Sequence, residues 1–225
     1  MGFLTLSLPA LVAAIVLGIL LIVFGGNFGP LMIASMILFL VLSAIVTAFG
    51  ITNKKKIGVA EKDRGIKNVI ANGLAPLIFS ILFAYYMPQI PIAHILILGF
   101  ISTVAAITAD KFSSEIGVLN GNPTMIFGLK KVKKGTSGGV TKLGLISGFL
   151  GSAIITIPAT IMYFLISSTY YSYYIVILII FIGFLGSIFD SMLGYFEECG
   201  FGNKYTSNFI ASILSGLLLV IIFLI

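Results

Sequence analysis

The sequence predicts an all-α protein: a polytopic bundle of about seven transmembrane helices, in one domain that covers residues 1–225. Hydrophobic residues make up 59% of the chain and charged residues 9%, and the mean hydropathy is +1.19. Such a chain has too few polar side chains to cover the surface of a soluble domain. A second observation is a set of seven apolar runs, each near the ~20 residues that a helix needs to cross a bilayer. They cover residues 6–24, 30–51, 68–87, 92–112, 143–166, 174–196 and 206–225.

The basic residues supply a third observation, because all 13 lysines and arginines lie in or beside three of the connections. Connections on the cytoplasmic side are enriched in Lys and Arg, so loops 52–67, 113–142 and 197–205 are predicted to face the cytoplasm. We expect both termini, the N-terminus included, on the outer side of the cell membrane. The same bias accounts for the net charge of +6, so nucleic acid is not an expected partner.

The first run is long and uncharged, and it is followed by Gly25-Gly26-Asn27-Phe28-Gly29-Pro30. Glycine and proline in this arrangement predict a tight turn into the second helix rather than a signal-peptide cleavage site. We therefore expect the first helix to remain in the mature protein.

The third helix begins with a polar stripe. Arg64, Asn68 and Asn72 are spaced four residues apart and so share one helix face. An amide inside the membrane needs a partner, and these residues form a polar stripe that enters the membrane from the cytoplasm. The stripe is predicted to bind nucleotide or phosphate. Hydrogen bonding of the two asparagines to another helix is the alternative.

The fourth helix ends in acidic residues. Asp110 and Ser114 lie one turn apart, whereas Glu115 converges with Asp110 only if the helix ends or bends there. A carboxylate at this depth is costly unless it is paired, solvated or bound to a cation. Asp110 is therefore predicted to bind a metal ion, and an ion pair with a lysine is the alternative.

The long fourth connection, residues 113–142, is rich in lysine, glycine and hydroxyl residues. Small residues leave backbone N–H groups accessible, lysines precede them, and the start of a helix follows, so the segment is suited to bind phosphate. It lacks the spacing of a Walker loop, and a flexible loop beside anionic lipid is the alternative. The residues predicted to bind nucleotide or phosphate here are Lys130, Lys133, Gly135, Thr136, Ser137, Gly138, Gly139 and Thr141, with Lys131 as a catalytic cation.

The sixth helix carries Asp190 between Gly186 and Gly194, a four-residue repeat that lets neighbouring backbones approach closely. Ser187 and Ser191 flank the carboxylate, and Asn208 on the seventh helix lies at the same level. These three residues are predicted to bind nucleotide or phosphate. Asp110 and Asp190 at matched depth are suited to hold Mg²⁺, with Glu115 as a third candidate ligand. A cation between these carboxylates and phosphates would neutralise charge during phosphoryl transfer.

These segments resemble the transmembrane protein 19 family, which includes phytyl-phosphate kinases. The resemblance rests on Ala-Asp-x-x-x-Ser-Glu-Ile-Gly at 109–117, Gly-Thr-Ser-Gly-Gly-Val-Thr at 135–141, Gly-Ser-x-x-Asp-Ser-x-Leu-Gly at 186–194 and Asn72-Gly73. Lys111 stands where that family usually has Thr, and Lys134 where it has Pro. The chain is also loosely similar to polyprenol kinases and CDP-diacylglycerol synthases.

The resemblance implies a Mg²⁺-dependent kinase that phosphorylates an isoprenyl monophosphate, such as phytyl or geranylgeranyl phosphate, with CTP or another nucleoside triphosphate as donor. Two other functions stay open. A cation-coupled transporter would use Asp110 and Asp190 as ion ligands, although the charges lie on one face only. A CTP-dependent lipid nucleotidyltransferase would share metal and nucleotide. The sequence also leaves a homo-oligomer open.

Overall fold

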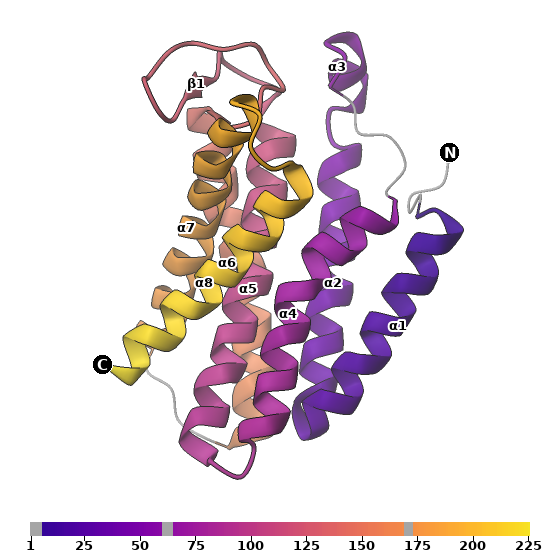
Figure 1. The fold of residues 1–225 in the computed structure, drawn as a ribbon, viewed down its shortest axis with the longest axis vertical. Coiled ribbons are helices and arrows are strands. Elements are labelled where there is room, and N and C mark those ends of the chain that lie inside the picture. The colour runs from indigo at the N-terminus through magenta and orange to yellow at the C-terminus, as the bar shows by residue number, and fades with distance from the viewer. Residues whose placement is uncertain (1–5, 60–64, 169–172) are drawn as a thin grey trace.

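The computed structural model describes residues 6–59, 65–168 and 173–225, and in these ranges it is a bundle of seven long helices (Figure 1). The long helices are α1 (Leu8–Gly25), α2 (Gly29–Ala48), α4 (Ile66–Tyr86), α5 (Ile90–Gly117), α6 (Lys142–Ser167), α7 (Tyr173–Glu198) and α8 (Lys204–Leu224). The short elements are η1 (Gly26–Phe28), α3 (Ile51–Lys56), β1 (Thr124–Met125) and β2 (Gly139–Val140). The predicted all-α class is confirmed.

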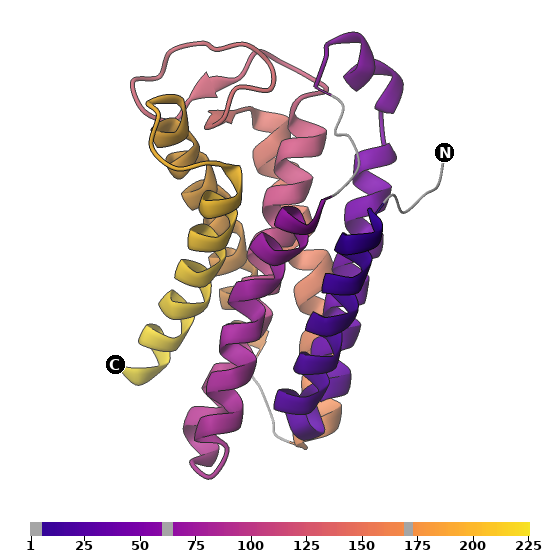
Figure 2. The same cartoon turned by 45° about the vertical axis from the view of Figure 1, so that its right-hand side comes forward.

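Six stretches of the described chain are long and apolar enough to span a membrane, so the protein is an integral multi-pass membrane protein. One of them, Leu8–Ala48, is 41 residues long and contains both α1 and α2. It folds back on itself at η1, and both views show α1 and α2 side by side (Figures 1 and 2). A Cβ on Gly29 would lie 2.9 Å from the carbonyl oxygen of Ile22, so the turn needs glycine there, as predicted.

Helix α5 lies at the centre of the bundle and is the most deeply buried of the spans. It packs against α2, α4, α6, α7 and α8. It continues to Gly117, five residues past the predicted end at 112, and therefore carries Glu115 on its last turn. The prediction placed the end of the helix where the apolar run ends. The helix continues past that point, and Glu115 on its last turn is paired with Lys54 and Lys111.

The end of the bundle that carries α3, β1 and the α7–α8 connection is called the loop end (Figure 1). At the opposite end, the ring of Phe28 stacks on Tyr163 with centroids 5.4 Å apart, and the Tyr163 hydroxyl is hydrogen-bonded to His94. These rings join η1 to α5 and α6. The far end of the bundle is thus held by ring contacts and one hydrogen bond.

The start of α1 and the end of α8 lie at opposite ends of the bundle. Helix α1 begins at Leu8 toward the loop end, whereas α8 runs away from the loop end to Leu224 (Figures 1 and 2). Seven long helices that alternate in direction must begin and end on opposite sides of the membrane. The prediction that both termini face outward was therefore wrong for the start of α1, which lies on the side of the basic connections.

Candidate functional site

A polar cavity of about 350 Å³ lies at the loop end, between α5, α7, the start of α8 and the α5–α6 connection. It brings together residues from segments far apart in the sequence. Those predicted from the sequence are Asp110, Glu115, Gly135, Thr136, Ser137, Gly138, Gly139, Thr141, Asp190 and Ser191. Lys134, Glu197 and Lys204 also line it.

Asp110 and Asp190 are adjacent in this cavity. Both side chains are half-buried, and their carboxyl groups lie within hydrogen-bonding distance of each other. Asp110 belongs to α5 and Asp190 to α7, and both helices run toward the loop end. The two aspartates that the sequence placed at matched depth thus meet in space.

Small residues one turn earlier explain this meeting. A Cβ on Gly186 would lie 2.4 Å from the Cβ of Ala106, so α7 can approach α5 this closely only with glycine at that position. Asp110 follows Ala106 by one turn, and Asp190 follows Gly186 by one turn. The close backbone contact therefore sets the two carboxylates against each other.

The glycine-rich loop packs on α7 one turn past Asp190. A Cβ on Gly194 would lie 2.4 Å from the amide nitrogen of Gly138, and Gly138 itself has φ +74°. The antiparallel pairing of β1 and β2, with Met125 opposite Gly139, holds the other side of the loop. The loop backbone is thus fixed beside the aspartate pair.

Most of the amide donors in this loop already have acceptors in the protein. The N–H groups of Thr136 and Gly139 donate to carbonyls of the same loop, at 3.2 Å each. The N–H of Ser137 donates to Glu198 Oε1 at 2.9 Å. The expected backbone cradle for phosphate is therefore limited, and the loop offers the cavity chiefly the side chains of Thr136, Ser137 and Lys134.

Two of the predicted hydroxyl ligands have structural roles. Thr141 caps α6, since its Oγ1 accepts from the Gly144 amide at 3.0 Å and donates to the Gly117 carbonyl at 3.1 Å. Ser187 is buried and donates to the Phe184 carbonyl at 2.8 Å. Ser191 is half-buried and lines the cavity, and its hydroxyl donates to the Ser187 carbonyl at 3.0 Å.

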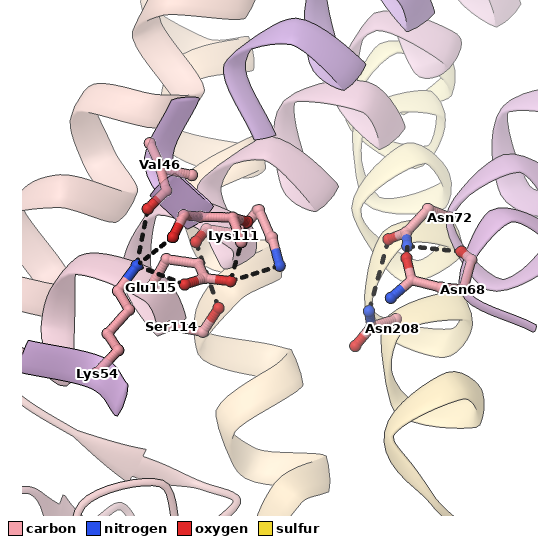
Figure 3. A network of polar contacts seen from close by, with 9 residues as sticks. Val46, Lys54, Asn68, Asn72, Lys111, Ser114, Glu115 and Asn208 are labelled. Atoms are coloured by element: carbon pink, nitrogen blue, oxygen red, sulfur yellow. Dashed lines mark hydrogen bonds and ion pairs between the residues drawn. The ribbon is translucent and has the colours of Figure 1, made fainter. Parts of the chain in front are cut away.

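Glu115 forms a buried ion-pair network (Figure 3). Its Oε2 lies 2.6 Å from Lys54 Nζ and its Oε1 lies 2.7 Å from Lys111 Nζ. The Lys54 side chain is fully buried and also donates to the carbonyls of Val46 and Thr47, at 2.8 and 3.2 Å. An ion pair with lysine was the alternative role for Asp110, and in the structure Glu115 forms such pairs, with Lys54 and Lys111.

Glu115 lines the same cavity as the aspartate pair, but its carboxylate is engaged by this network. In the described part of the chain, no three His, Cys, Asp or Glu side chains are arranged to share a metal ion. Both carboxylate oxygens of Glu115 are paired with lysines, so the metal-ligand prediction is better supported for Asp110 and Asp190. Lys111, where the resembled family usually has Thr, is one of those two lysines.

The cations of the cavity differ from those expected. Lys130, Lys131 and Lys133 are exposed and do not line the cavity, because this part of the loop folds outward as a hairpin in which the Met125 amide donates to the Lys130 carbonyl. Lys134 and Lys204 line it instead. In the sequence, Lys134 could have been recognised as a cavity residue from its position directly before Gly135. For Lys204 the one indication was its position at the start of α8.

A chain of amides connects α4 to α8 (Figure 3). Asn72 Nδ2 donates to Asn68 Oδ1 at 2.9 Å, and Asn208 Nδ2 donates to Asn72 Oδ1 at 3.5 Å. With its amide turned over, Asn208 instead donates to Asp190 Oδ1 at 3.1 Å. Asn208 is thus in contact with both Asn72 and Asp190. Arg64, predicted as part of this stripe, lies outside the described residues.

The model of the family described as integral membrane protein DUF92 matches residues 3–217. The chain belongs to the DUF92 family. The DUF92 match covers every residue of the cavity and of the amide chain.

Two relatives are similar over most of this chain. Uncharacterized membrane protein MJ0933 of Methanocaldococcus jannaschii is 35% identical over 187 residues, which cover 82% of this chain and 73% of that protein. Protein PGR of Arabidopsis thaliana is 30% identical over 179 residues, which cover 72% of this chain and 62% of that protein. No solved structure matches the chain significantly.

Proposed function

We propose that this DUF92 protein is a membrane kinase that transfers a phosphoryl group from a nucleoside triphosphate to an isoprenyl monophosphate and so forms the diphosphate. The observation that carries the proposal is the contact between Asp110 and Asp190 in a cavity that also contains Lys134 and Lys204. The resemblance to the phytyl-phosphate kinases supports the substrate class and makes CTP the first donor to test.

The donor set fits Mg²⁺. This ion prefers oxygen ligands and usually binds through one or two carboxylates, with phosphates and water completing its shell. Asp110 and Asp190 supply two carboxylates that are half-buried and line a polar cavity. A bound Mg²⁺ would supply neutralisation of the phosphate charges.

The surrounding residues suit a polyphosphate. Lys134 and Lys204 bring positive charge to the same cavity, and Thr136 and Ser191 bring hydroxyl groups. Phosphoryl transfer depends mostly on positioning and charge stabilisation rather than on covalent chemistry by the protein. We assign Lys134 and Lys204 to the phosphates of the donor.

The reaction needs no general base. An oxygen of the acceptor monophosphate is already ionised and attacks the γ-phosphorus, the bond from that phosphorus to the β–γ bridging oxygen breaks, and the nucleoside diphosphate leaves. The cavity accordingly requires positive charge around the phosphates. His94, the one histidine of the sequence, lies at the far end of the bundle and is not needed as a base. A hydrophobic tail on the acceptor explains why such a site would be built inside membrane helices.

The test is product analysis with the purified protein in detergent, given geranylgeranyl phosphate, Mg²⁺ and each of the four common nucleoside triphosphates. We expect the isoprenyl diphosphate and the nucleoside diphosphate in equal amounts. A nucleotidyl lipid with release of pyrophosphate would instead identify a nucleotidyltransferase. Unchanged lipid and nucleotide with every donor would contradict both enzymatic functions and favour a transporter.

A further inference from the structure

We propose that a second, apolar cavity between α1, α2 and α4 holds the hydrocarbon chain of the lipid phosphate, with its polar end at Asn68 and Asn72. This inference rests on the proposed function and adds the location of the tail. The cavity has a volume of about 370 Å³, within the ~300–1,000 Å³ usual for ligand pockets.

Three helices form the walls of this cavity, and both views show them along one side of the bundle (Figures 1 and 2). Leu11 and Ile15 of α1 face it together with Ile33 of α2. Helix α4 packs tightly on α1 beside the cavity, since a Cβ on Gly73 would lie 2.6 Å from Leu17 Cδ1. The side chains of Leu11 and Ile15 are exposed, so the cavity is open on the outer face of the bundle. Such walls favour a hydrocarbon chain over a polar ligand.

The polar lining is confined to one end. Asn68 and Asn72, near the start of α4, are the polar side chains among the described residues of this cavity. The cavity extends from that level along α1 as far as Ile22, and Leu11 to Ile22 corresponds to about 16 Å of helix. An elongated apolar space with amides at its loop end matches a single chain that carries a phosphate head group.

The amides connect the tail site to the aspartate pair. Asn72 also lines a narrow space of about 10 Å³ together with Asp110, Asp190 and Asn208. Asn72 therefore lies between the apolar cavity and the carboxylates, with Asn208 on the carboxylate side. Both N–H groups of the Asn72 amide donate to Asn68, to its carbonyl at 2.8 Å and to Oδ1 at 2.9 Å. A phosphate head group at this end of the apolar cavity would take over one of these donors, because amide N–H groups are good donors to phosphate oxygens.

Photolabelling of the wild-type protein tests the location independently of catalysis. The probe is an alkyl phosphate with a photoreactive group near the end of its chain, and the labelled peptides are identified by mass spectrometry. We expect labels on α1 and α2, and competition by excess geranylgeranyl phosphate but not by geranylgeraniol. Labels on α5, α6, α7 or α8, or equal competition by the alcohol, would overturn the tail site even if the kinase reaction is found.

A substitution tests the same site through chain-length preference. A Cβ on Gly18 would lie 3.4 Å from Ile33 Cδ1, an ordinary contact, so Gly18→Phe can fill the cavity without displacing backbone. We expect the KM for geranylgeranyl phosphate to rise about tenfold, as the loss of contact with about two methylene groups implies, while the KM for geranyl phosphate changes little.

Ile161→Phe is the matched control, because Ile161 is exposed on α6 and does not line the apolar cavity. It should leave both KM values unchanged. An equal rise for both substrates in Gly18→Phe would overturn the tail site. If the wild type makes no diphosphate, the proposed kinase fails, and the photolabelling pattern alone then decides whether a lipid phosphate binds here.

Discussion

Gly194 and Gly138 are in contact backbone to backbone, such that a Cβ on Gly194 would lie 2.4 Å from the Gly138 amide nitrogen. This contact fixes the glycine-rich loop one turn beyond Asp190. The position of the loop relative to the aspartate pair thus depends on two residues that have no side chain. Neither could be replaced without moving the loop or the helix.

Gly194→Ala should displace the loop and raise the KM for the nucleotide. Its added methyl group must be relieved by a backbone shift, at a cost of about 1–3 kcal/mol in the free energy of unfolding. Kinetics with varied nucleotide and a thermal unfolding curve measure the two effects. Gly65→Ala is the matched control, because a Cβ on Gly65 meets no atom within 4 Å. Equal kinetics for the two variants would contradict the proposed role of the contact.

Lys54→Met should destabilise the protein. Lys54 is fully buried against Glu115, and removing one member of a buried pair leaves a charge poorly compensated, at a cost of about 3–5 kcal/mol. Lys111 still pairs with Glu115, which places the expected loss at the lower end of that range. Chemical unfolding in detergent measures it.

Lys55→Met on the same short helix α3 is the control for that measurement, since Lys55 is exposed. The double variant Lys54→Met with Glu115→Gln should recover part of the lost stability, because the uncompensated carboxylate is then absent. A Lys54→Met protein as stable as the Lys55→Met protein would show that the buried pair contributes nothing.

Lys204→Met and Lys134→Met should each raise the KM for the nucleotide about tenfold, the equivalent of one charge-assisted contact to phosphate. Both lysines line the cavity, whereas Lys131 is exposed outside it. Lys131→Met should therefore have the smaller effect. Steady-state kinetics of the three variants distinguish the two sets, and a larger effect at Lys131 would restore the assignment based on sequence alone.

Hydropathy and charge were sufficient to predict the long helices and the end of the bundle that carries the site. The aspartate pair was also predictable, because Asp110 and Asp190 are carboxylates at the same depth and Gly186 permits close helix contact. These inferences depend on local spacing and on the cost of charge in a membrane, both of which a sequence contains.

The partners of the remaining polar groups could not be predicted in the same way. Lys54 looked like one of several equivalent loop lysines, and only the position of α3 just past the end of α2 brings its side chain to the Val46 carbonyl and to Glu115. The outward hairpin that exposes Lys131 depends on pairing between Thr124 and Lys131, which no local pattern indicated. The loop amides were expected to be accessible, but turns inside the loop and Glu198 engage them.

The central claim is that Asp110 and Asp190 together hold the metal for phosphoryl transfer, and Asp→Asn substitutions test it most directly. Asp110→Asn and Asp190→Asn keep the size of each side chain, and both purified proteins should unfold at a temperature close to that of the wild type. We expect isoprenyl diphosphate formation at saturating Mg²⁺ to fall at least about 10³-fold in each, because the charges of the phosphates are no longer compensated. Wild-type turnover by either folded variant would contradict the account.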